Sequence, residues 1–143
     1  HCLSSAASDV YKRQDAITTQ IVSDTAGVKF VVKRTNHSDG TGETDSVLVD
    51  PATSNFMTAD GTKTIAKVWY SINVANSKSA VELAWGGATE NTTTLLLSGN
   101  GYLDFRTAGN DIPNNATTPN GKVHLSTKNF ALGDNYTLVV EFR

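Results

Sequence analysis

Hydrophobic and polar residues alternate in short runs along most of the chain, and segments rich in Gly, Asn, Asp and Ser separate these runs. Alternation with a period of two is typical of β-strands, and no segment has the i, i+3, i+4, i+7 spacing of an amphipathic helix. The pattern predicts little or no helix and nine strands, at residues 16–23, 28–34, 46–49, 64–74, 81–87, 93–97, 102–105, 122–127 and 136–142.

Turn residues suggest how the strands are connected. Gly27 ends a segment that is typical of a hairpin turn, and the sequence SGNG at 98–101 predicts a second hairpin between the strands on either side of it. Residues 106–121 contain two prolines and four asparagines, so they predict a long surface loop. Because loops on a rigid scaffold carry most binding functions, this loop is the expected site of any specificity.

Nine short strands without helical connections cannot form a parallel sheet, because each parallel connection needs a dozen or more residues. We therefore predict an all-β fold, a single antiparallel two-sheet sandwich of jelly-roll type. The residues expected to face inward are Val28, Phe30, Val32, Val47, Val49, Val68, Tyr70, Ile72, Leu83, Trp85, Leu95, Leu97, Phe105, Val123, Leu125, Leu138, Val140 and Phe142.

The sequence of the first residues indicates an origin different from that of the rest of the chain. SSAASDVYKRQ, residues 4–14, matches the in-frame translation of a transposon-end sequencing adapter, which points to an open reading frame from a metagenomic assembly. We expect residues 1–14 to be a disordered artefact and residues 15–143 to be one β-sandwich domain. Without them the chain keeps ten Lys and Arg against thirteen Asp and Glu, a formal charge of −3, and loses its only cysteine, Cys2.

Composition excludes several classes of function. A chain without thiols has no disulfide and no cysteine nucleophile. Weak acidity with dispersed lysines argues against a nucleic-acid partner, which would require a clustered basic face. No window approaches the ~20 apolar residues of a membrane-spanning helix.

Candidate catalytic and metal-binding residues are better explained by structural roles. The carboxylates of the segment 39–45, DGTGETD, do not have the spacing of a calcium loop and fit an ordinary turn. His37 and His124 lack partners for a triad or a zinc site. Glu82, Asp104 and Glu141 would support glycoside hydrolysis only if two of them converged in a cleft. We expect no enzymatic activity, no metal and no cofactor.

Two aromatic residues are not accounted for by the predicted core. Alternation places Trp69 and Tyr102 on the outer faces of their strands, where amphipathic rings could stack against a sugar. With Asn114 and Asn115 of the long loop they form a candidate surface-binding site. A carbohydrate- or host-surface-binding module is therefore the alternative function, and it predicts that both rings are exposed together beside the loop 106–121.

Five segments carry a family resemblance: AITTQIVSDTAGVKFVVKRT, TIAKVWYSI, LLLSGNGYLDF, IPNNA and YTLVVEFR. They resemble successive blocks, spread over residues 16–143, of a group of small virion proteins of marine tailed bacteriophages. The resemblance implies a virion structural protein, a capsid decoration or other head or tail accessory protein that acts by assembly with other virion proteins. It supplies no catalytic residue. A homo-oligomer such as a trimer is expected, with no nucleic-acid or membrane partner.

Overall fold

Nine strands make up about half of the described residues, as the alternation predicts. The computed structural model describes residues 14–143, so the expected disorder of residues 1–13 lies outside the described part of the chain. The strands are β1 (Ala16–Thr25), β2 (Lys29–His37), β3 (Ser46–Val49), β4 (Ile65–Asn73), β5 (Ala80–Gly87), β6 (Thr92–Leu97), β7 (Asn100–Asp104), β8 (Pro119–Lys128) and β9 (Asn135–Phe142). Within residues 14–143, helix is limited to the short turns η1 (Pro51–Thr53) and α2 (Phe105–Ala108).

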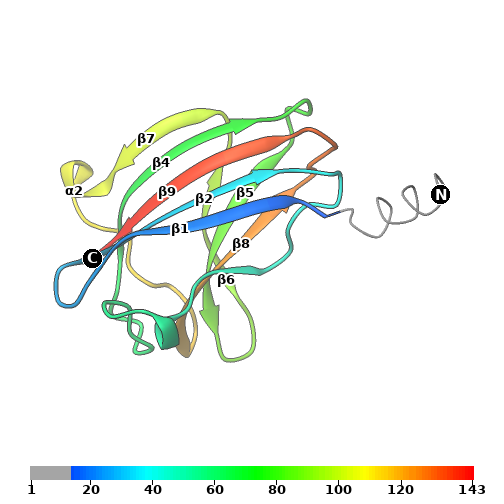
Figure 1. Ribbon diagram of the computed structural model, residues 1–143. Helices are drawn as coiled ribbons and strands as arrows, with labels where there is room; N and C mark the ends of the chain where they lie inside the picture. The colour runs from blue at the N-terminus through cyan, green and yellow to red at the C-terminus, as the bar shows by residue number, and fades with distance from the viewer. Residues whose placement is uncertain (1–13) are drawn as a thin grey trace.

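The strands form two antiparallel sheets that pack face to face (Figure 1). The five-stranded sheet has the order β1-β2-β9-β4-β7 and the four-stranded sheet has the order β3-β8-β5-β6. Strand β2 pairs with β9, β3 with β8, β4 with β7 and β5 with β6. The first four of these eight strands thus pair in reverse order with the last four, which is the topology of a jelly roll. The predicted all-β sandwich is confirmed.

The core lies between the sheets and consists mainly of the predicted inward residues. Trp85, Phe142, Leu125, Val123 and Val140 are fully buried, and the Trp85 and Phe142 rings meet edge to face with their centroids 5.9 Å apart. Tyr70, Leu95 and Phe105 are partly buried against this core.

Two predicted core residues are exposed instead. Val28 is 50% exposed because it belongs to the β1–β2 turn, where its N–H donates to the Thr25 carbonyl. Val47 is 42% exposed because a bulge opposite β8 shifts the alternation of β3, so that Leu48 and Val49 are buried side by side. Bulges break the period of two on which the prediction depends.

A similar irregularity affects β4. The pairing of β4 with β9 shifts between Ile65 and Lys67, and both Ile65 and Ala66 are buried although simple alternation places Ile65 on the wet face. Other core residues lie outside the predicted inward set: Phe56, Met57, Val81, Phe130 and Tyr136.

The predicted hairpin at 98–101 is wrong. Strands β6 and β7, on either side of it, belong to different sheets, so the turn carries the chain from one sheet to the other. Gly99 has a φ of +71°, which fits the predicted turn chemistry. Turn residues specify a reversal of the chain, but they do not specify whether the two strands pair. The β1–β2 hairpin, in contrast, is confirmed, with Gly27 at a φ of +72°.

Strand β1 extends the five-stranded sheet beyond the eight-stranded core. Among the described residues its only paired neighbour is β2, and it has no extensive contact with another element. Ile17 and Ile21 pair with Asn36 and Val32, which are 2% and 1% exposed, yet the two isoleucines are 41% and 51% exposed. Directly paired residues share a face of the sheet, so the buried layer ends at β2 and β1 overhangs it.

Candidate functional site

The outer face of the five-stranded sheet carries an exposed aromatic pair. Trp69 of β4 lies directly opposite Tyr102 of β7 in the strand register. Their rings stack with centroids 5.0 Å apart and planes inclined by 18°, while 37% of Trp69 and 49% of Tyr102 stay exposed. The structure thus brings together the two aromatic residues that the sequence singles out.

A shallow groove of about 210 Å³ lies beside this pair. Its lining residues are Trp69, Tyr70, Ser71, Gly101, Thr137 and Val139, from strands β4, β7 and β9. No side chain in this lining is charged at neutral pH. The absence of a Cβ at Gly101 matters here, because a Cβ would come within 2.6 Å of the Tyr70 hydroxyl. Gly101 therefore allows the Tyr70 side chain to lie across β7.

Hydrogen bonds connect the aromatic pair to the start of the long loop. The Tyr102 hydroxyl donates to Oδ2 of Asp104 at 3.1 Å, and Asp104 in turn accepts from the backbone N–H and hydroxyl of Thr107 in α2. The bond from the Thr107 backbone is the largest cause that lowers the pKa of Asp104. Partial burial and the bond to Asp104 raise the pKa of Tyr102, which keeps its hydroxyl protonated as a donor.

The two candidate asparagines lie elsewhere. Asn115 donates from Nδ2 to the Thr93 carbonyl of β6 at 3.2 Å, and β6 belongs to the four-stranded sheet. Asn114 accepts from the Ala116 N–H at 2.9 Å, a local turn contact. The structure therefore does not join Asn114 and Asn115 to the aromatic pair.

A larger open depression, of about 640 Å³, lies at the beginning of the long loop. It is lined by Thr64, Arg106, Gly109, Asn110, Asp111 and Pro113. Its charged groups neutralise each other, since Arg106 pairs with Asp111 at 3.0 Å. Thr64 donates to the same Asp111 carboxylate at 3.1 Å. This depression therefore contains no unpaired charge.

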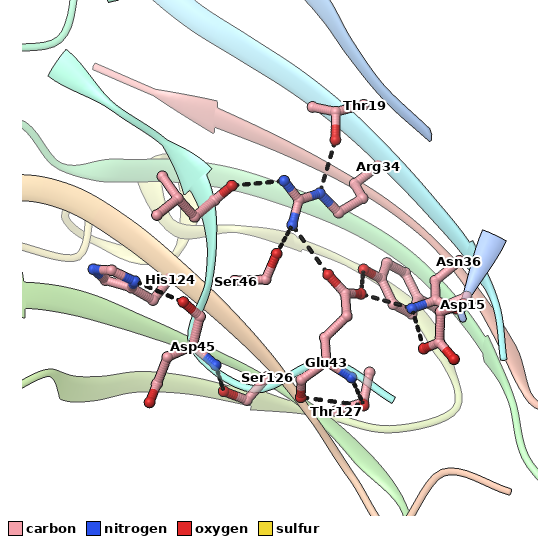
Figure 2. A network of polar contacts seen from close by, with 12 residues as sticks. Asp15, Thr19, Arg34, Asn36, Glu43, Asp45, Ser46, His124, Ser126 and Thr127 are labelled. Atoms are coloured by element: carbon pink, nitrogen blue, oxygen red, sulfur yellow. Dashed lines mark hydrogen bonds and ion pairs between the residues drawn. The ribbon is translucent and has the colours of Figure 1, made fainter. Parts of the chain in front are cut away.

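The most extensive polar cluster surrounds Arg34, Glu43 and Asp15 and is buried (Figure 2). The sequence did not predict it. Arg34 of β2 and Glu43 of the following loop form an ion pair at 3.1 Å, with side chains only 6% and 2% exposed. Arg34 also donates to Thr19, Ser46 and the Val47 carbonyl. Three strands, β1, β2 and β3, are thus tied to one guanidinium group.

The other Glu43 oxygen continues the cluster. It accepts from Asn36 Nδ2 at 2.7 Å and from the Tyr136 hydroxyl. Burial and the nearby Glu43 charge raise the pKa of Tyr136, so its hydroxyl remains a donor. Every second residue of β2 faces inward, and after Phe30 and Val32 the next two such residues are the polar Arg34 and Asn36. This continued alternation is the signal by which the sequence could have indicated the cluster.

Asp15 completes the cluster at the start of β1. Its carboxylate accepts from Asn36, Ser38 and Thr41 and from the backbone N–H groups of Asp39 and Gly42. Burial alone would raise the pKa of Asp15, but the bonds from Asn36, Asp39 and Gly42 outweigh it and lower the pKa. These hydrogen bonds fasten the loop 38–45 to the sheets, while Asn36 Oδ1 and Asp39 Oδ2 are buried without a hydrogen-bond partner among residues 14–143.

The remaining candidate residues do not converge. Lys67 pairs in register with both Asp104 and Glu141 and so lies between them, whereas Glu82 is on the four-stranded sheet and pairs with Lys128. His124 contacts the Asp45 carbonyl, and His37 lies on the other sheet. Within residues 14–143 no group of three or more His, Cys, Asp or Glu side chains is placed to hold a metal ion.

Comparisons with known proteins identify no family. No family model matches the chain, and no curated protein matches it significantly. Among solved structures, Peruvianin-I, a cysteine peptidase from Thevetia peruviana latex, aligns with 92% of this chain and 68% of its own at a TM-score of 0.38 and 12% identity. A likeness of this size says nothing about activity. None of the helices in the described part of the chain is long and apolar enough to cross a membrane.

Proposed function

We propose that this chain is a structural protein of a bacteriophage virion, a capsid decoration or other head or tail accessory protein that acts by protein–protein assembly. The observation that carries the assembly role is the outer edge of β1, which pairs with no strand of residues 14–143 and exposes Ile17, Ile21 and Val22 by 41%, 51% and 58%. The virion role rests on the resemblance of the five sequence segments to marine phage proteins. The jelly roll, a fold common among capsid proteins, is compatible with it.

Of the features that keep edge strands from associating, β1 has a bulge between Ile21 and Ser23 but lacks the others over residues 16–23. In an antiparallel ladder, every second residue of an edge strand directs its N–H and C=O groups away from the sheet. Natural proteins protect such edges with lysines, prolines or short strands. Strand β1 is ten residues long, and residues 16–23 include no proline and no charged side chain. Its edge is therefore available to a strand from another subunit.

A partner strand at this edge would account both for the unpaired backbone of β1 and for its exposed side chains. It would pair with the free backbone groups, and its side chains would cover the overhanging face that exposes Ile17 and Ile21. The partner is either another virion protein or a further copy of this chain in a homo-oligomer, with a cyclic trimer as one arrangement. Because residues 16–23 are uncharged, repulsion does not oppose association between copies.

The test is the oligomeric state of the purified protein by analytical ultracentrifugation. We expect concentration-dependent association that Ile21→Lys abolishes, because a lysine at an edge prevents strand pairing. Leu132→Lys, at a loop residue that is 70% exposed, is the matched control and should associate like the wild type. A monomer at the highest attainable concentration, or association that survives Ile21→Lys, would contradict assembly of copies through β1.

The virion role has a separate test in the genes beside this one on the source contig. Capsid, portal or tail genes are expected there. Polysaccharide-utilisation genes in their place would count against a virion protein.

A further inference from the structure

The groove beside Trp69 and Tyr102 is not used by the proposed assembly. It lies on β4, β7 and β9, at the opposite side of the five-stranded sheet from β1. Exposed aromatic rings lose hydrophobic stabilisation that a buried position would provide. Trp85, the other tryptophan of the chain, is fully buried, which shows that the fold does bury a ring of this size. The exposure of Trp69 therefore needs its own explanation.

The chemistry of the groove matches an uncharged sugar. A pyranose ring has an apolar C–H face, which suits the amphipathic rings of Trp and Tyr, and a rim of hydroxyl groups. Ser71 and Thr137, whose side chains carry hydroxyl groups, are among the lining residues and lie directly opposite each other in the strand register. The next pair along these strands is Asn73 and Asn135, whose side chains are joined at 3.2 Å. Aromatic, hydroxyl and amide groups thus follow one another along the same two strands.

The size and charge of the groove disfavour other ligands. Single-stranded nucleic acids stack on aromatic rings only where basic groups also follow the phosphates, and the lining contains no Lys or Arg. Lys67, the nearest basic residue along β4, lies between Asp104 and Glu141 in the register. The volume of about 210 Å³ is below the roughly 300–1,000 Å³ of pockets that enclose drug-sized ligands. It suits one sugar unit of a chain that continues over the open surface.

We propose that the groove beside the stacked Trp69 and Tyr102 rings binds an uncharged glycan, with one pyranose ring against the Trp69 side chain and its hydroxyl groups toward Ser71 and Thr137. A glycan of this kind is found on cell surfaces and in free polysaccharide, and the groove recognises the chemistry that both share. This inference does not depend on the proposed assembly through β1.

The experiment titrates the full chain with neutral hexasaccharides of glucose, galactose and mannose, and observes the two tryptophan indole N–H signals by NMR. We expect at least one of the three to shift the Trp69 signal in a saturable manner and to leave that of the buried Trp85 in place. A hexasaccharide of alginate, which carries carboxylates, should bind at least about tenfold more weakly, because the lining offers no cation to pair with them.

Variants test whether the rings carry the binding. Trp69→Ala and Tyr102→Ala should each weaken binding about tenfold or more, and Trp69→Phe should retain part of it, since an aromatic face remains. Leu96→Ala on β6 removes a side chain that is 63% exposed on the four-stranded sheet and is the matched control. Chemical shifts of the core residues show that each variant is folded.

Three outcomes would overturn the proposal: no saturable shift with any neutral hexasaccharide, equal binding of the alginate oligosaccharide, or unchanged affinity in a folded Trp69→Ala. Ile21→Lys should bind the glycan like the wild type. Glycan binding by this variant therefore tests the groove independently of assembly through β1.

Discussion

The two sides of the five-stranded sheet depart from the usual placement of side chains in opposite ways. Near β1 and β2 the charged groups of Arg34, Glu43 and Asp15 are buried, whereas on β4 and β7 the rings of Trp69 and Tyr102 are exposed. Charged residues are rarely buried unless they are paired. The buried side follows that rule, because partners within the fold satisfy its charges.

The two regions differ in what they contribute: the buried cluster stabilises the fold, and the aromatic pair is available for binding. The buried cluster joins β1, β2, β3 and the loop 38–45, and the charges of Arg34, Glu43 and Asp15 are all hydrogen-bonded within the fold. The aromatic rings contact each other but keep much of their surface open beside a groove. Changes in the buried cluster should therefore affect mainly folding, and changes at the aromatic pair should affect mainly binding.

The largest expected effect is at Glu43. Glu43→Gln removes the carboxylate charge and leaves the Arg34 guanidinium buried without its ionic partner, so we expect a loss of about 3–5 kcal/mol in the free energy of unfolding. Urea denaturation of the wild type and the variant measures this loss. The matched control is Glu82→Gln, which breaks the more exposed pair with Lys128 and should cost less than about 1 kcal/mol. Equal costs for both variants would remove the distinction between buried and surface charges.

A smaller effect is expected at Asp15. Asp15→Asn should lower the free energy of unfolding at neutral pH by about 1.5–3 kcal/mol, the range for hydrogen bonds to a charged group. Because the folded pKa of Asp15 is below its ordinary value of 3.8, the carboxylate contributes stability above that pH. This contribution is lost as the pH falls from 3.8 through the folded pKa.

Thermal melts of the wild type and of Asp15→Asn over this range test the pH dependence. The difference between their melting temperatures should shrink in acid. A difference independent of pH would mean that the charge of Asp15 does not carry the effect.

The smallest expected effect on stability is at the aromatic pair. In Trp69→Ala the lost stacking should cost about 0.5–1.5 kcal/mol beyond the ring's partial burial, and the total should stay below the cost of about 3–5 kcal/mol expected for Trp85→Ala in the core. Urea denaturation of the two variants makes the comparison within one protein. A cost at Trp69 as large as that at Trp85 would assign the exposed ring a structural role and weaken its assignment to binding.

For residues 14–143 the sequence by itself determined the nine strands, the absence of long helices and most of the core, because alternation with a period of two is a local property of the chain. It also placed Trp69 and Tyr102 on outer faces. It failed at Val28, Val47 and Ile65, where a turn or a bulge shifts the alternation.

Apart from the β1–β2 hairpin, tertiary structure alone decided which strands are neighbours. The pairing of β4 with β7 stacks Trp69 on Tyr102, and the passage between sheets after β6 replaces the hairpin expected at 98–101. It also joins Asp15, Glu43 and Tyr136 from distant parts of the chain and leaves β1 beyond the edge of the other sheet. The physical reason is that alternation fixes the face on which a side chain lies, whereas long-range packing selects the strand beside it.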